Sequence, residues 1–124
     1  MLRFQVSIAG PSQDGKSCLA TTFEQAFALL HGWERLFIEP DGSFVWTGAT
    51  AGGAAWQVDG NLIDQGETLA RVELKGDCPA EQFDRLLSVF GWPETTLAFE
   101  LPRKGVCLAE DEFRKLAASE TGAT

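Results

Sequence analysis

Apolar and polar residues alternate along several short stretches of the chain, which is the period of a strand with one buried face. The alternation is strictest at residues 4–8, 69–75 and 97–101, where every second residue is apolar. Shorter strands are expected at residues 36–39, 44–46, 56–58, 62–63 and 106–108, which are mostly apolar. The pattern predicts an antiparallel or mixed sheet of about six strands.

Two other stretches repeat with the helical period. Their apolar stripes are Phe23, Ala26, Phe27 and Leu30 in the first, and Phe83, Leu86, Leu87 and Phe90 in the second. Thr21 or Thr22 is expected to cap the first helix, and Gly32 to end it in the left-handed conformation. Asp77 or Cys78 is expected to cap the second, with Gly91 as its stop.

Phe27 and Leu87 hold the middle of the two stripes, so we predict that both are almost fully buried. A third helix is expected from about Ala109 to Ala118, because acidic residues open that stretch and basic residues follow, the order that the helix dipole favours.

Turn-forming residues divide the strands. Pro40–Asp41–Gly42 predicts a hairpin turn, and Asp59–Gly60–Asn61 predicts a second one. Residues 48–55 are rich in Gly and Ala and predict a flexible loop.

These elements predict one α+β domain over residues 1–118. Two amphipathic helices cover one face of the sheet, a C-terminal helix follows, and residues 119–124 form a frayed tail. Residues 6–10 also match residues 72–76, and each segment precedes a striped helix and an apolar strand. This favours a duplicated β-α-β-β unit, with shared wiring but no common descent as the alternative.

Composition narrows the possible partners. The chain has 124 residues, 44% of them hydrophobic, and a net charge of −8. We expect neither nucleic acid nor an anionic membrane as a partner, because both bind clustered Lys and Arg. No signal peptide or membrane-spanning run is expected. The three cysteines, Cys18, Cys78 and Cys107, do not have the spacing of a metal site. We expect all three to be free thiols, which indicates a reducing, cytoplasmic setting.

The most specific motif is Gly10-Pro-Ser-Gln-Asp-Gly15-Lys16-Ser17, which satisfies the phosphate-loop pattern. In such a loop the glycines let backbone N–H groups surround a phosphate, the lysine neutralises its charge and the serine reaches magnesium. The predicted hairpins argue against this use, because phosphate-loop proteins have parallel sheets. A solvated turn is the alternative.

Other candidate chemistry is sparse. His31 is the single histidine, so it is the one possible base for a cysteine nucleophile, and its place at a helix end favours a structural role. Glu39 and Glu100 would form an acid–base pair only if their strands were neighbours. We predict no catalytic residues, no metal site and no cofactor.

Trp46 and Trp56 flank the Gly/Ala-rich loop. Indoles in such a place are either core residues or part of an aromatic surface that binds a partner. The sequence thus favours a small, acidic, non-catalytic protein-interaction module that forms a homodimer, since sheet edges must be covered. The alternative is a nucleotide- or phosphate-binding protein that uses Gly10, Gly15, Lys16 and Ser17.

Overall fold

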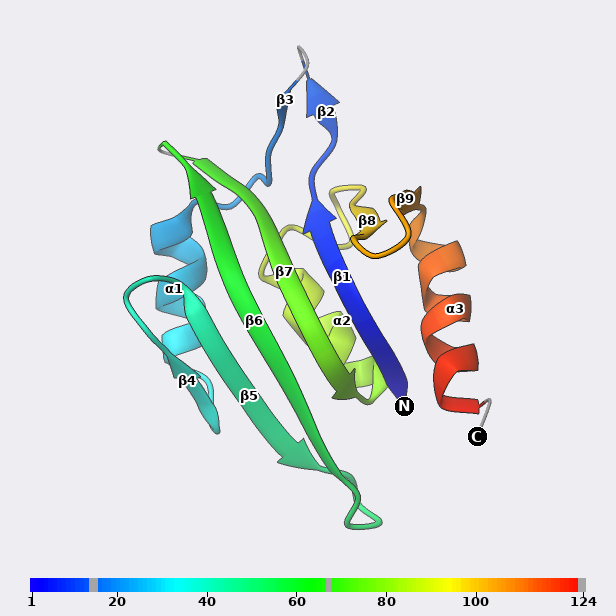
Figure 1. The fold of residues 1–124 in the computed structure, drawn as a ribbon. Helices are drawn as coiled ribbons and strands as arrows, with labels where there is room; N and C mark the ends of the chain where they lie inside the picture. Colours follow the sequence, from blue (N-terminus) through cyan, green and yellow to red (C-terminus); the bar gives the residue numbers. More distant parts are fainter. Residues whose placement is uncertain (14–15, 67, 123–124) are drawn as a thin grey trace.

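The computed structural model describes residues 1–13, 16–66 and 68–122, and the fold in this part of the chain is α+β (Figure 1). The strands are β1 (Leu2–Ala9), β2 (Ser12–Gln13), β3 (Lys16–Ser17), β4 (Leu36–Ile38), β5 (Ser43–Ala49), β6 (Ala55–Gln65), β7 (Thr68–Cys78), β8 (Ala98–Leu101) and β9 (Val106–Leu108). The helices are α1 (Phe23–His31), α2 (Ala80–Ser88) and α3 (Glu110–Gly122).

Seven of the strands form one antiparallel sheet in the order β4-β5-β6-β7-β1-β8-β9, and β2 pairs with β3 in a separate hairpin. The longest pairings lie in the middle, where β7 pairs with β6 on one side and with β1 on the other. The strand alternation in the sequence therefore predicted the sheet correctly, and the antiparallel alternative is the one that the protein adopts.

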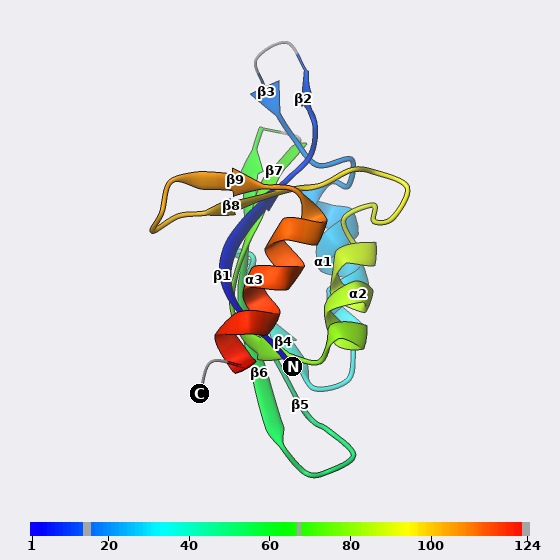
Figure 2. The same ribbon diagram turned by 90° about the vertical axis from the view of Figure 1, so that its right-hand side faces the viewer.

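α1 and α2 lie on one face of this sheet, whereas α3 lies at its end beside β1 (Figures 1 and 2). Alternate residues of β1 point into the layer between sheet and helices: Leu2, Phe4, Val6 and Ile8 are all buried. Phe83, Leu86 and Leu87 of α2 meet them from the other side. Among the described helices none is both long and apolar enough to cross a membrane.

The helix ends differ in part from expectation. Thr22, one of the two predicted caps, is the N-cap of α1. Its side chain and that of Gln25 form a reciprocal capping box. Gly32 was expected to be left-handed, but its φ is −85°, and Arg35 makes the positive-φ turn at 61°. At α2 the expected caps Asp77 and Cys78 are wrong, because both belong to β7 and Pro79 is the N-cap residue.

The predicted turn at residues 59–61 is also wrong, since β6 continues through it. Gly60 has a packing role instead: a Cβ at this position would lie 2.0 Å from Cζ of Phe44, whose ring covers the glycine on the neighbouring strand. The predicted loop at residues 48–55 is shorter than expected, because both of its ends belong to strands β5 and β6. Gly48 also has a packing role, since it makes room for the ring of Trp56 within the β5–β6 ladder.

The two halves share an order of elements but not a layout. β1 and β7 are central neighbours, and each is followed by a helix and a pair of strands, α1-β4-β5 and α2-β8-β9. However, β8 lies directly beside β1, whereas β4 lies at the far edge beyond β5 and β6. The predicted repeat therefore holds for the order of elements and not for their places in the sheet.

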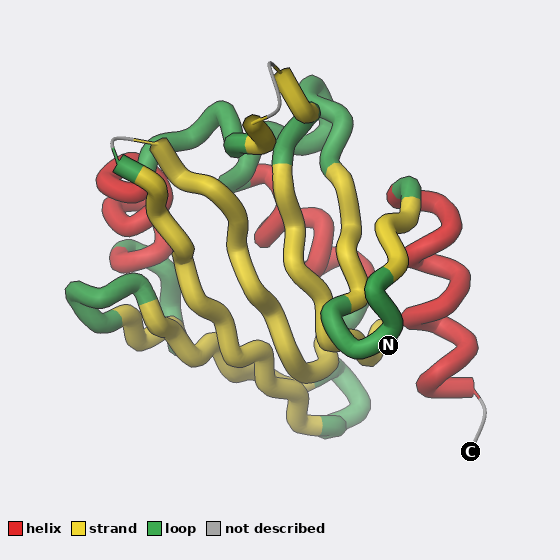
Figure 3. The backbone as a smooth tube through the Cα atoms, turned by 45° about the horizontal axis from the view of Figure 1, so that its top comes forward, coloured by secondary structure: helices red, strands yellow, loops and turns green. Residues whose placement is uncertain are grey.

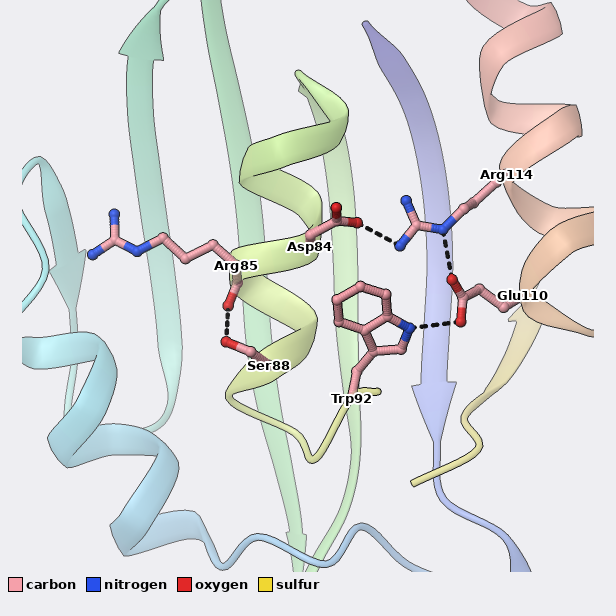
Figure 4. Close-up of polar contacts among 6 residues, drawn as sticks. All are labelled: Asp84, Arg85, Ser88, Trp92, Glu110 and Arg114. Carbon is pink, nitrogen blue, oxygen red and sulfur yellow. Dashed lines mark hydrogen bonds and ion pairs between the residues drawn. The ribbon is translucent and has the colours of Figure 1, made fainter. Parts of the chain in front are cut away.

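A network of hydrogen bonds and ion pairs connects α3 to Asp84 of α2 and to Trp92, which follows α2 (Figure 4). The Arg114 guanidinium contacts Asp84 Oδ1 at 2.6 Å and Glu110 Oε2 at 2.8 Å. The indole N–H of Trp92 donates to the second oxygen of Glu110 at 2.6 Å. These contacts fix α3 beside β1, where residues 119–122, predicted as a frayed tail, continue the helix.

Candidate functional site

The face of the sheet opposite α1 and α2 is polar. Two rows of cross-strand neighbours cross β6, β7 and β1 there: Gln57, Asp77 and Arg3 form one row, and Asp59, Lys75 and Gln5 form the next. This is the outward set of side chains that strict alternation leaves when the inward set fills the core. The tip of the β8–β9 hairpin projects past β1 toward this side of the sheet (Figure 2).

A groove lies between these rows, the β8–β9 turn and α3. It consists of a hollow of about 630 Å³ and a smaller one of about 320 Å³, and both are lined by Gln5, Asp59 and Lys75. The larger hollow extends to Arg3, to Arg103 and Lys104 of the turn, and to α3. The tube in Figure 3 shows this turn standing in front of the sheet. We call the two hollows together the sheet groove.

The sheet groove concentrates positive charge in an acidic chain. Arg3, Lys75, Arg103 and Lys104 line its larger hollow, four of the ten Lys and Arg residues of the protein. None of the four forms an ion pair with a described residue.

The two acidic residues in the larger hollow each accept a hydrogen bond from Gln57. Asp59 Oδ1 accepts from the Gln57 side chain at 2.9 Å, and Asp77 Oδ1 accepts from the Gln57 backbone N–H at 3.2 Å. Both carboxylates keep their charge, but the four cations outnumber them, so the larger hollow favours an anion.

The opposite wall of the larger hollow is apolar. Leu101, Phe113, Leu116 and Ala117 form it, the last three from α3, and Leu116 is the one of the four that is only partly buried. Across residues 1–13, 16–66 and 68–122, no three His, Cys, Asp or Glu side chains gather as they would around a metal ion. The arrangement suits the binding of a ligand with both anionic and apolar groups.

The described part of the predicted phosphate loop lies in a small hairpin. Ser12 and Gln13 pair with Ser17 and Lys16 in a small hairpin, and α1 begins six residues after Ser17. Gly10 approaches the backbone of Cys18 so closely that a Cβ would lie 2.1 Å from its carbonyl oxygen. Gly15 lies outside the described residues, so phosphate binding stays a prediction that the structure does not test.

Trp46 and Trp56 are core residues, with 2% and 7% of their surface exposed. Their rings meet edge to face at 4.9 Å, and Trp33 packs on Trp46 at 5.0 Å. The guanidinium of Arg85 stacks over Trp33 at 4.1 Å and closes the cluster toward α2. Of the two roles considered for these indoles, the structure shows that of core residues. Binding of a partner through them stays a prediction.

The remaining candidates do not come together. His31 stacks on Phe27 at the end of α1, with 5.8 Å between the ring centres. Glu39 follows β4 at one edge of the sheet, whereas Glu100 lies on β8 toward the other, so these two carboxylates are not an acid–base pair.

The three cysteines are free and differ in exposure, which leads to a chemical prediction. Cys78 is buried, and burial, with a smaller effect of the Asp77 charge, raises the pKa of its thiol to about 12. At pH 8 only about one such thiol in ten thousand is the reactive thiolate. We expect iodoacetamide to label exposed Cys107 in the folded protein and Cys78 only after denaturation, as measured by intact mass. Equal labelling rates would contradict this.

The sheet groove was not predicted from the sequence. Alternation places Arg3 and Lys75 on the outer face of their strands, but it does not say that these strands are neighbours or that Arg103 and Lys104 lie in front of them. Comparisons with protein-family models, with curated proteins and with solved structures find no match for this chain, so its function has to be argued from the groove.

Proposed function

We propose that the protein is a non-catalytic protein-interaction module whose sheet groove binds an acidic segment of a partner protein. The observation that carries this proposal is the gathering of Arg3, Lys75, Arg103 and Lys104 without ion-pair partners among the described residues. In a chain with 18 acidic and 10 basic residues, such a cluster selects an anion by charge.

The shape and lining of the groove favour a peptide over a nucleic acid. The two hollows adjoin along β1 and β7, which suits an extended chain better than a compact ligand. Leu116, which is only partly buried, offers apolar contact to side chains between the acidic ones. The net charge of −8 opposes the long, uniformly anionic backbone of a nucleic acid, whereas a short acidic segment need meet only the basic hollow.

The proposal is tested with a fluorescent (Glu-Leu)5 peptide, with (Ser-Leu)5 and (Lys-Leu)5 as probes of charge. We expect the acidic peptide to bind most tightly, with a dissociation constant of about 10–100 µM, because exposed ion pairs each contribute only about 0.2–1 kcal/mol. Binding measured by fluorescence anisotropy should weaken as salt rises from about 20 to 300 mM, since screening shortens the range of the charges.

Charge reversal in the groove gives the decisive comparison. The double variant Arg103→Glu, Lys104→Glu is expected to weaken binding at least tenfold, and both positions are exposed, so the fold is retained. The matched control, Lys115→Glu with Arg71→Glu, changes the net charge equally at exposed, described positions that line neither hollow. If the control weakens binding as much as the groove variant, or if all three peptides bind alike, the proposal is wrong.

We further propose that the module acts as a homodimer in the cytoplasm. Free Cys18, Cys78 and Cys107 support a reducing compartment. The uncovered edge of the sheet at β4 supports self-association, because an open edge exposes backbone groups that another strand can pair with.

A further inference from the structure

We infer that two copies of the protein pair through β4, antiparallel and symmetric about Phe37, so that the two sheets become one. This inference rests on the homodimer of the proposed function and is independent of the sheet groove. It specifies which edge is used, in which register, and which side chains meet.

The first observation is an exposed aromatic on an edge strand. β4 is the last strand of the sheet, and Phe37 at its centre is 75% exposed. Its cross-strand neighbour Val45 is 37% exposed on the same face. An apolar patch on a sheet edge is a site for strand pairing rather than an ordinary solvated surface.

The second observation is the direction of the backbone groups. The Thr47 N–H donates to the Arg35 carbonyl at 3.1 Å, and the Glu39 N–H donates to the Ser43 carbonyl at 2.8 Å. Phe37 lies midway between these two bonds and pairs with Val45, and backbone groups in a strand alternate between its two sides, so Phe37 also turns its groups toward β5. The N–H and C=O groups of Leu36 and Ile38 therefore point to the outer edge.

These directions fit a second copy in one register. Centred on Phe37, an antiparallel pairing sets Leu36 opposite Ile38 of the second copy, so their outward groups exchange hydrogen bonds. Phe37 then faces Phe37 of the second copy in a non-hydrogen-bonded pair, where side chains come closest. A two-fold axis through Phe37 makes the contact closed, as in most homodimers.

Charge complementarity favours a second copy over an unrelated strand. In this register Arg35 lies beside Glu39 of the second copy, and the symmetry repeats the opposite charges on the other side of the axis. On the helix side, α1 lies next to β4 and carries a row of stacked aromatic rings (Figure 1). Phe23, Phe27 and His31 stack with ring separations of 6.2 and 5.8 Å, and Phe27 is only half-buried.

Phe37→Lys tests the edge directly, since it places two like charges opposite each other at the axis and alters a side chain outside the core. We expect light scattering and sedimentation equilibrium at about 100 µM to give a dimer for the wild type. For Phe37→Lys we expect a dissociation constant at least tenfold higher. The matched control is Val106→Lys, an exposed apolar position on β9 at the opposite edge, and it should dimerise like the wild type.

A charge swap tests the register. Arg35→Glu and Glu39→Arg should each weaken the dimer, and the double variant should regain most of the loss because the pairs are restored with reversed signs. A wild-type protein that is monomeric would overturn both the homodimer and this interface. A dimer that persists in Phe37→Lys, or a double variant weaker than both single ones, would overturn the interface alone.

Discussion

Leu87→Ala is expected to lower the free energy of unfolding by about 2–5 kcal/mol, which is a large part of the roughly 5–15 kcal/mol that a domain of this size has. Leu87 is 0% exposed and lies on the face of α2 that packs against the sheet. Truncation removes the transfer energy of its side chain and leaves a cavity among packed neighbours. Urea denaturation followed by circular dichroism measures the loss.

Phe27→Ala is the matched control, since the sequence places Phe27 at the corresponding position of the first stripe. We expect a loss of only about 1 kcal/mol, because Phe27 is only partly buried and its ring stacks on Phe23 and His31 rather than entering the core. The prediction of near-complete burial for Phe27 is wrong, since Ala26 and Leu30 are the residues that α1 buries. Equal losses for the two variants would contradict the placement of the helices.

Gly76→Ala is expected to destabilise the protein by about 3 kcal/mol or more. Gly76 lies near the C-terminal end of β7 with φ at +140°, a conformation that side chains disfavour. In addition, a Cβ there would lie 2.1 Å from the Gln57 carbonyl oxygen on β6, which is backbone and cannot turn aside. The substitution therefore forces apart two central strands that form the floor of the sheet groove.

Gly53→Ala separates the two causes. Gly53 also has a positive φ, +88°, but nothing lies within 4 Å of its missing Cβ. We expect this control to lose about 1 kcal/mol from backbone strain alone. Thermal unfolding of both variants at the same pH measures the difference, and a Gly76→Ala protein as stable as Gly53→Ala would show that β6 and β7 do not approach as described.

The candidate site was less predictable than the fold, and its residues show why. Arg3 and Asp77 are 74 positions apart in the chain and meet only through the register of β1 with β7. In the sequence, Arg103 and Lys104 have the pattern of an ordinary polar turn, which gives no sign of a binding site. By contrast, the phosphate-loop motif was conspicuous because it is contiguous, yet its described part forms a hairpin.

Local patterns in the sequence by themselves determined the elements of this protein. Alternation in β1, the stripe of α2 and the Thr22 cap are set by neighbours within a few residues, and the structure has each of them. Tertiary packing alone decided the structural roles of Gly60 and Gly76. Gly60 makes room for the Phe44 ring, and Gly76 makes room for the Gln57 carbonyl, each on a neighbouring strand. It also decided which face stays open, because the side of the sheet that the helices cover depends on contacts that no local pattern records.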